Sequence, residues 1–241
     1  PTGFNGAGDV SFNDTIDLSN VILSGDLTIN NGDSGVVVFD KAIGSAFPID
    51  SLIVSGKSPI HVSNNLTTTG SMIFNGPVLI KDDVTFNSVT AGINFQSSIS
   101  GNKNLTLSAP GSAGSILVKG NVNLTQTGQE GKPIVAFARN NITFEGDILT
   151  SGGSGGGVGF DGGDVTLTSN GSIVVKNITN SGGFSSTTGK MNSSGKIALA
   201  GSSNFQQGTL GPPETKIPDG KIVLFGNLTG GEITLGAVTP R

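Results

Sequence analysis

The residues best spaced for chemistry in this chain form a glycine-rich run that ends on an aspartate. The run Gly156-Gly157-Val158-Gly159-Phe160-Asp161 matches the opening of the calcium-binding nonapeptide Gly-Gly-x-Gly-x-Asp once. Calcium ions take carboxylate and carbonyl oxygens as ligands. The carboxylates that could gather around one cation here are Glu145, Asp147, Asp161 and Asp164. Tandem copies are missing and the aliphatic position of the motif is Gly163. We therefore favour a glycine-rich loop with solvated carboxylates, and we expect no metal and no cofactor.

Residues that could perform acid–base catalysis do not form a set. The single histidine, His61, has no partner motif beside it, and an outward-facing position on a strand is the simpler interpretation. Asp82 and Asp83 are adjacent, so strand alternation would point them to opposite faces, and solvated turn charges are favoured. Arg139 is isolated. Since no nucleophile–base pair emerges, we expect no enzyme, and a polysaccharide-binding or polysaccharide-degrading protein is the alternative.

A short phrase recurs through the middle of the chain and indicates which elements hold these residues. It consists of a small acid or amide, an aliphatic residue, a threonine and usually a further apolar residue. Six copies start 18 to 23 residues apart, at Asn65, Asp83, Asn104, Asn123, Asn141 and Asp164. Looser copies start at Asp26, Asn227 and Glu232. A period of about 20 residues with irregular insertions is typical of a solenoid in which each repeat is one coil.

The phrase itself predicts a strand. Its apolar positions are two residues apart and therefore share one face, while threonine is β-branched and suits the outer face. The leading Asn or Asp fits a turn that ends there. Coils of about 20 residues with two or three short strands describe a parallel β-helix, an all-β fold of about 12 coils for this length. We expect Leu105, Leu107, Ile142, Phe144, Val165 and Leu167 to face the lumen and to stack in register.

Composition supports this fold and excludes several classes of protein. Charged residues make up 12%, there are 39 glycines, and Cys, Trp and Tyr are absent, so a helical domain with a charged surface is not expected. The net charge is −4 without a basic stripe, which argues against nucleic acid as a partner. Disulfides and thiolate metal sites are excluded. No run of 18 apolar residues exists, so no membrane span is expected.

The domain prediction is one parallel β-helix over residues 1–241. Residues 1–64 are the least regular part. Runs rich in Gly, Ser and Pro predict loop insertions near 151–163, 181–195 and 202–219. Because the chain begins at Pro1 and shows no signal peptide, we interpret it as a portion of something larger.

Two stretches resemble the repeat region of filamentous-haemagglutinin-like exoproteins. One runs from Asp83-Val84-Thr85-Phe86 through Asn104-Leu105-Thr106-Leu107 to Gly114-Ser115-Ile116, and the other from Gly162 to Ile173. The resemblance covers about residues 60–240. It implies a bacterial extracellular or cell-surface protein, exported by two-partner secretion, whose right-handed parallel β-helix is a shaft or filament element. Adhesion to glycans or a host surface through the loops is the alternative role.

Two further expectations concern the surface and the ends of the chain. Asn-x-Ser/Thr sequons occur at nine positions, and the repeat itself accounts for them, because Asn precedes strands and Thr fills them. A β-helix exposes an unpaired strand edge at each end, and neither terminus shows a capping repeat. We therefore expect copies to join end to end, or the helix to continue in a longer chain, and a monomer capped by its own terminal residues is the alternative.

Overall fold

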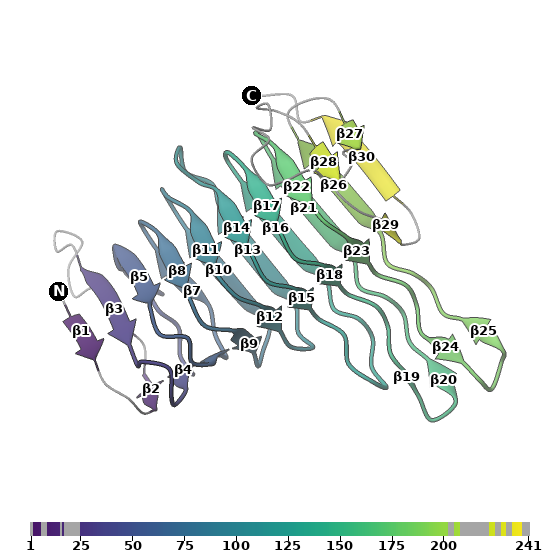
Figure 1. Cartoon of the computed structure of the whole chain (residues 1–241), viewed down its shortest axis with the longest axis horizontal. Helices are drawn as coiled ribbons and strands as arrows, with labels where there is room; N and C mark the ends of the chain where they lie inside the picture. The colour runs from purple at the N-terminus through teal and green to yellow at the C-terminus, as the bar shows by residue number, and fades with distance from the viewer. Residues whose placement is uncertain are drawn as a thin grey trace.

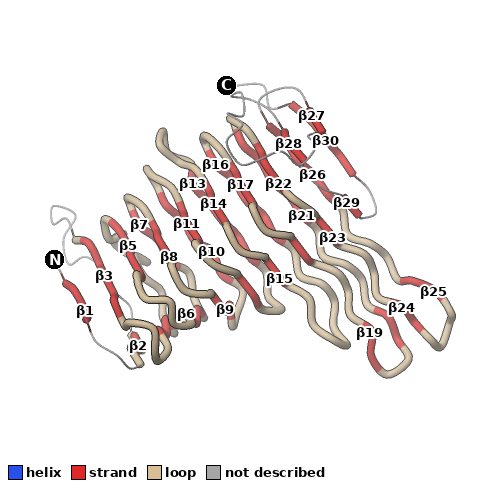
Figure 2. The backbone as a smooth tube through the Cα atoms, in the orientation of Figure 1, coloured by secondary structure: helices blue, strands red, loops and turns tan. Residues whose placement is uncertain are grey.

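The computed structural model is all-β, and every long sheet in it is parallel (Figures 1 and 2). It describes the backbone of residues 2–5, 9–14, 16, 25–201, 205–207, 222–224, 228–229 and 233–237, and the side chains of 9–14, 16 and 25–201. The described residues include no helix that could cross a membrane.

Three parallel sheets run the length of the molecule. Sheet A has ten strands in the order β1 (Thr2–Asn5), β3 (Asp26–Asn30), β5 (Ser51–Val54), β8 (Met72–Phe74), β11 (Ile93–Phe95), β14 (Ile116–Val118), β17 (Ile142–Phe144), β22 (Ile173–Val175), β28 (Ile222–Leu224) and β27 (Phe205–Gln207). Sheet B has nine, β2 (Val10–Phe12), β4 (Val37–Phe39), β6 (Ile60–Val62), β9 (Val78–Ile80), β12 (Ile99–Ser100), β15 (Val122–Asn123), β18 (Ile148–Leu149), β23 (Ile178–Thr179) and β29 (Leu228–Thr229). Sheet C has seven, here in chain order, β7 (Leu66–Thr68), β10 (Val84–Ser88), β13 (Leu105–Ala109), β16 (Ile134–Ala138), β21 (Val165–Ser169), β26 (Ile197–Gly201) and β30 (Ile233–Ala237).

Successive strands visit the three sheets in turn, so each pass through A, B and C is one coil. After β8 in sheet A, the chain forms β9 in sheet B, β10 in sheet C, and then returns to sheet A as β11 beside β8. The same rotation continues to β23. The chain is therefore a parallel β-helix, as the sequence predicts. We call this three-sheet body the shaft.

Coil length departs from the expected value of about 20 residues. Hydrogen bonds between neighbouring coils join residues 20 apart at Asn75 and Ser55. They join residues 26 apart at Asp147 and Asn121, and 32 apart at Lys196 and Asp164. From β5 onward the coils therefore lengthen along the chain, whereas the earlier pair β3 and β5 joins Asp26 to Ser51, 25 residues apart. The added residues lie in the connections between strands, since the strands of sheet C keep five residues from β10 to β26.

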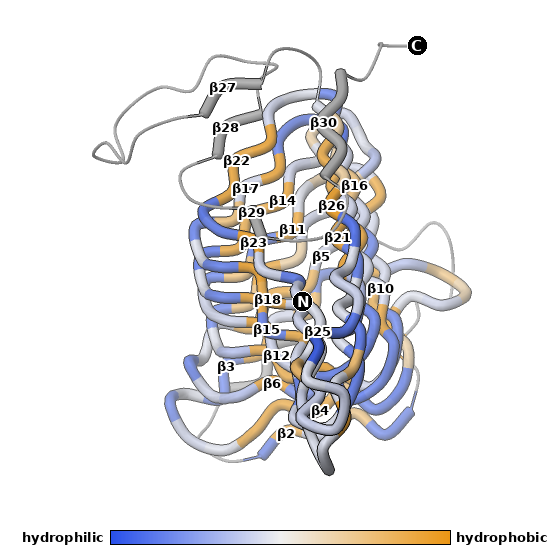
Figure 3. The backbone as a smooth tube through the Cα atoms, turned by 90° about the vertical axis from the view of Figure 1, so that its right-hand side faces the viewer, coloured by the Kyte–Doolittle hydropathy of each residue, from blue (hydrophilic) through white to orange (hydrophobic). Residues whose placement is uncertain are grey.

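The lumen explains why buried and exposed side chains alternate along each strand. In the five-residue strands of sheet C, buried residues alternate strictly with partly exposed ones from β13 to β21, and Val135, at 43%, is more exposed than the other outward residues. The hydrophobic segments recur at the strands of successive coils (Figure 3). Inside the shaft, Phe74 stacks on Phe95 with ring centroids 5.0 Å apart, and Phe86 meets both rings edge-on. Burial of these rows supplies most of the stability, at about 25 cal/mol per Å² of apolar surface.

The six residues expected in the lumen are all buried, but they do not form one register. Leu105 and Leu107 pair across β16 with Val165 and Leu167, through Ile134 and Ala136 of that intervening strand. Ile142 and Phe144 belong to β17 in sheet A, on a different side of the coil. The predicted inward orientation is therefore confirmed. The predicted common register is wrong, because copies of the phrase begin strands in different sheets of the coil.

The irregular beginning of the chain joins the same sheets. Strands β3 to β6 pair in parallel with the coils that follow. Isolated parallel bridges join Ile16 to Ile43 and Ile43 to Leu66, the first residue of β7 in sheet C. Most of the expected loop at 202–219, the sequon at Asn227 and both chain ends lie outside the described residues.

Candidate functional site

Among the described residues, the chain departs most from the shaft at the corner between sheets B and C. In early coils this corner is short, residues 81–83 between β9 and β10. Later it expands into three segments, 125–133, 151–163 and 181–195, which we call the arm. Two of them form antiparallel hairpins: β19 (Ser154–Gly155) with β20 (Val158–Gly159), and β24 (Phe184–Ser185) with β25 (Lys190–Met191). Figure 1 shows both hairpins projecting from the shaft.

Backbone hydrogen bonds join the arm segments side by side. The N–H of Gly153 donates to the carbonyl of Gln129 at 2.8 Å, and the N–H of Phe160 donates to Gly153 at 3.1 Å. The N–H of Gly183 donates to Phe160 at 2.7 Å, and that of Asn192 donates to Gly183 at 2.9 Å. The arm is thus a ladder of backbone that continues from coil to coil.

Glycine is required in this ladder because the backbones approach closely. A Cβ on Gly183 would lie 2.0 Å from the carbonyl oxygen of Gly153, and one on Gly159 would lie 2.2 Å from that of Gly183. Real Cβ atoms do not come so close to backbone. At the hairpin tip, Gly156 and Gly157 have φ of +57° and +80°, a region that glycine adopts without strain. The run that matched the calcium motif therefore has a structural reason for its glycines.

The four calcium candidates do not form one site. Glu145 and Asp147 precede β18 at the corner between sheets A and B, whereas Asp161 and Asp164 follow the first hairpin and precede β21 in sheet C. Within the part of the chain that the structure describes, no three acidic or histidine side chains gather as a metal site would require.

Three of these carboxylates are engaged by the next coil. Oδ1 of Asp161 accepts the backbone N–H of Ser193 at 2.9 Å, and Oδ1 of Asp164 accepts that of Lys196 at 2.7 Å. Oδ1 of Asp147 accepts the side-chain amide of Asn177 at 2.8 Å. Their oxygens therefore connect coils, a role that the leading position of the phrase did not reveal.

This role extends along the shaft. The Asn or Asp that precedes a strand accepts the N–H of the residue beside it in the next coil. Such bonds join Asp9 to Val36, Asn65 to Thr85, Asp83 to Asn104, Asn121 to Asp147 and Asn141 to Ser172, at 2.8 to 2.9 Å. Each side chain supplies an acceptor where the parallel ladder of backbone bonds begins. In four of the six copies of the phrase, at Asn65, Asp83, Asn141 and Asp164, the leading Asn or Asp is thus a structural residue, and the sequons at Asn65 and Asn141 arise from it.

The remaining chemical candidates stay apart. His61 is a partly exposed residue of β6, and its pKa lies below the ordinary value of 6.5 because burial disfavours the imidazolium, with Lys81 acting in the same direction and Asp40 opposing it. Asp82 pairs with Lys103 at 3.3 Å. Arg139 is exposed after β16. None of these lies beside a second group that would complete an acid–base pair among the described residues.

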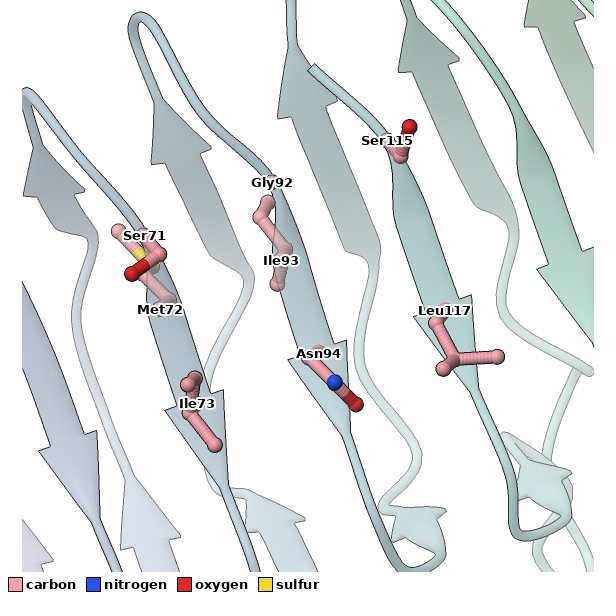
Figure 4. A pocket seen from close by; sticks show the side chains of 8 residues that line it. All are labelled: Ser71, Met72, Ile73, Gly92, Ile93, Asn94, Ser115 and Leu117. Atoms are coloured by element: carbon pink, nitrogen blue, oxygen red, sulfur yellow. The ribbon is translucent and has the colours of Figure 1, made fainter. Parts of the chain in front are cut away.

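The described surface includes two hollows in which a ligand could sit. One, of about 250 Å³, lies on the outer face of sheet A between β8, β11 and β14, where Ile73, Asn94 and Leu117 line it (Figure 4). It contains no titratable side chain. The other, of about 590 Å³, lies at the corner between sheets B and C and is lined by lysines, amides and one carboxylate, Asp83. Of these two hollows, only the second is lined by charged side chains.

Comparisons with family models, curated proteins and solved structures find no match to this chain.

Proposed function

We propose that this chain is a structural shaft: an element of a bacterial extracellular or cell-surface protein of the filamentous-haemagglutinin-like kind. The observation that carries the proposal is the unbroken parallel ladder of sheet A from β3 to β22. A rod held by main-chain bonds and an apolar lumen can hold two ends of a molecule apart, because each coil is fixed by its neighbours.

The outer face of the shaft supports the same role. The outward residues of sheet C are mostly small and polar, as in the row Thr85, Thr106, Val135 and Thr166, where Val135 is the one large apolar residue. The ion pairs of the described residues are few and exposed, and such pairs contribute little to binding or stability. A surface of this kind suits a rod that separates other modules.

The proposal includes no catalytic step. Asp83 is the one carboxylate among the residues that line the large hollow, and its two oxygens accept the N–H and the Nδ2–H of Asn104, each at 2.9 Å. A general acid or base needs a free oxygen within reach of the substrate. An enzyme that cleaves polysaccharides would therefore need groups other than those in the hollow.

We further propose that copies associate end to end. Edge strands offer unpaired N–H and C=O groups to a further strand, and β1 is the outermost strand at the amino end of sheet A. Axial association extends the sheets and leaves the lateral faces free.

Sedimentation velocity and electron microscopy of the purified chain test this function. We expect straight filaments with one axial repeat, formed equally by the parent and by Val135→Lys, which alters an exposed residue on the lateral face of sheet C. A stable monomer at high protein concentration would contradict end-to-end association. Loss of the filaments in Val135→Lys would mean that the contact is lateral, which also contradicts it.

A further inference from the structure

The hollow at the corner between sheets B and C has the size of a ligand site. Its volume of about 590 Å³ lies within the range of pockets that hold small molecules, 300 to 1,000 Å³. Three successive connections build it: the corner after β9, the corner after β12, and the first segment of the arm. Neighbouring strands are about 4.8 Å apart, so the hollow extends along the shaft over three coils.

Three lysines, one from each connection, give the hollow its charge. Lys81, Lys103 and Lys132 line it, against the single carboxylate of Asp83. The chain as a whole has the opposite sign, with 13 basic and 17 acidic residues. Counting Asp82 and Glu130, which do not line the hollow, the three connections are balanced in charge, so the excess of lysine is confined to the residues that line the hollow, where it favours an anionic ligand.

The lysines are available to such a ligand to different degrees. Lys103 pairs with Asp82 at 3.3 Å and Lys132 with Glu130 at 3.7 Å, and both acids are well exposed. Exposed pairs of this kind are weak, so a ligand carboxylate can replace the acid. The backbone N–H of Lys81 donates to the carbonyl of Val62 at 2.8 Å, but its exposed side chain makes no hydrogen bond or ion pair within the described residues.

Neutral amides complete the lining and indicate what else the ligand offers. Gln126 and Gln129 line the hollow, and their side chains bond to none of the residues that the structure describes. An amide presents both donors and acceptors. Sugar hydroxyls do the same, whereas phosphate and sulfate groups offer acceptors only.

A break in the ladder of Asn and Asp acceptors adds one more free group. The residue beside Asn104 in the next coil is Pro133, as the register of Leu105 with Ile134 fixes. Proline has no N–H to donate. Asn104 therefore keeps its Oδ1 unpaired within the described residues, at the wall of the hollow.

We propose that this hollow binds an oligosaccharide that carries carboxylate groups. The lysines bind the carboxylates, with Lys81 as the principal contact, and the amides of Gln126, Gln129 and Asn104 bind the hydroxyls. The site lies on the side of the shaft and does not depend on the proposed end-to-end assembly. A rod with such sites would attach along its length to an acidic polysaccharide.

Isothermal titration of the full chain with oligogalacturonate tests the site. We expect binding that weakens at high ionic strength, and that weakens roughly tenfold or more when the carboxylates are methyl-esterified, since charge-assisted hydrogen bonds are then lost. Lys81→Met should reduce the affinity roughly tenfold. The matched control is Lys119→Met, which removes the same charge after β14, at the corner between sheets A and B, and should bind as the parent does.

Three outcomes would overturn the proposal. These are equal binding of the esterified and the free oligosaccharide, equal affinity of the Lys81→Met and Lys119→Met variants, and tighter binding of polyphosphate than of oligogalacturonate. Circular dichroism of each variant verifies folding, and electron microscopy of the same samples reports assembly separately, so a failure of the site is distinguishable from a failure of the shaft.

Discussion

The shaft and the arm are built by the same coils but held by different forces. In the shaft, apolar side chains from three sheets fill the lumen, so the side chains determine which strands are neighbours. In the arm, glycine backbones lie against each other and main-chain hydrogen bonds determine the neighbours. The shaft therefore tolerates change on its outside and none within, whereas the arm tolerates change at its tips and none where its segments meet.

The largest expected effect breaks the shaft. Leu107→Asp places a charge in the lumen, where Leu107 has no exposed surface, and should destabilise the fold by several kcal/mol, since an unpaired buried charge is costly. Thr106→Asp, on the outer face of the same strand, should change the free energy of unfolding by less than about 1 kcal/mol. Chemical denaturation measures both, and equal stabilities would contradict the inward assignment.

A smaller effect should break the arm alone. Gly183→Ala forces a Cβ against the carbonyl of Gly153, and we expect a loss of about 1–3 kcal/mol from overpacking. Hydrogen exchange should rise in residues 151–163 and 181–195 while the strands of sheet A keep their protection. The control is Gly189→Asn, where φ is +68° and no atom lies near, because asparagine tolerates that conformation. If exchange rises equally throughout the shaft, the two regions are not separate.

The junction of shaft and arm depends on Asp164. Asp164→Ala removes the acceptor for the N–H of Lys196 and should cost about 0.5–1.5 kcal/mol, whereas Asp164→Asn keeps an acceptor oxygen and should cost less. Thermal unfolding distinguishes the two variants.

A chelator should leave the stability of the parent unchanged, because the oxygens of Asp161 and Asp164 accept backbone hydrogen bonds. A large loss of strand signal on chelation would point to a calcium site after all.

The smallest effect concerns His61 on the outside of the shaft. Its pKa is lowered in the folded protein, so the unfolded chain binds the proton more readily, and stability should fall as the pH drops through the region below 6.5. His61→Gln should remove this slope between about pH 7 and pH 5.5, where histidine is the side chain that titrates. A slope that persists unchanged in the variant would exclude His61 as its source.

The fold was predictable because, in strands of all three sheets, the apolar residues at alternate positions are the ones that face the lumen. The register was not, because the phrase occurs at all three corners: before β13 and β21 in sheet C, at β15 in sheet B, and at β17 in sheet A. The strand that lies between β13 and β21 is β16, which follows Pro133 and does not carry the phrase.

The candidate site was less predictable than the fold. The glycine-rich run suggested calcium because its composition is the same whether glycines surround an ion or a neighbouring backbone. The lysines of the hollow are 22 and 29 residues apart in sequence and share no motif, since unequal coil lengths bring them to one corner. Only the observed register places Lys132 beside Lys103.

Disulfide formation between introduced cysteines tests the stacking of the coils most directly, since the chain has no cysteine of its own. Thr106 and Val135 are register partners on the outer faces of β13 and β16. Their Cα atoms should be about 5 Å apart, within the range that a disulfide spans. The sequence period instead aligns Thr106 with Thr125, which the structure places beyond β15 at a different position around the coil. We predict that Thr106→Cys with Val135→Cys forms a disulfide on oxidation and that Thr106→Cys with Thr125→Cys does not, and the reverse result would contradict this arrangement of the coils.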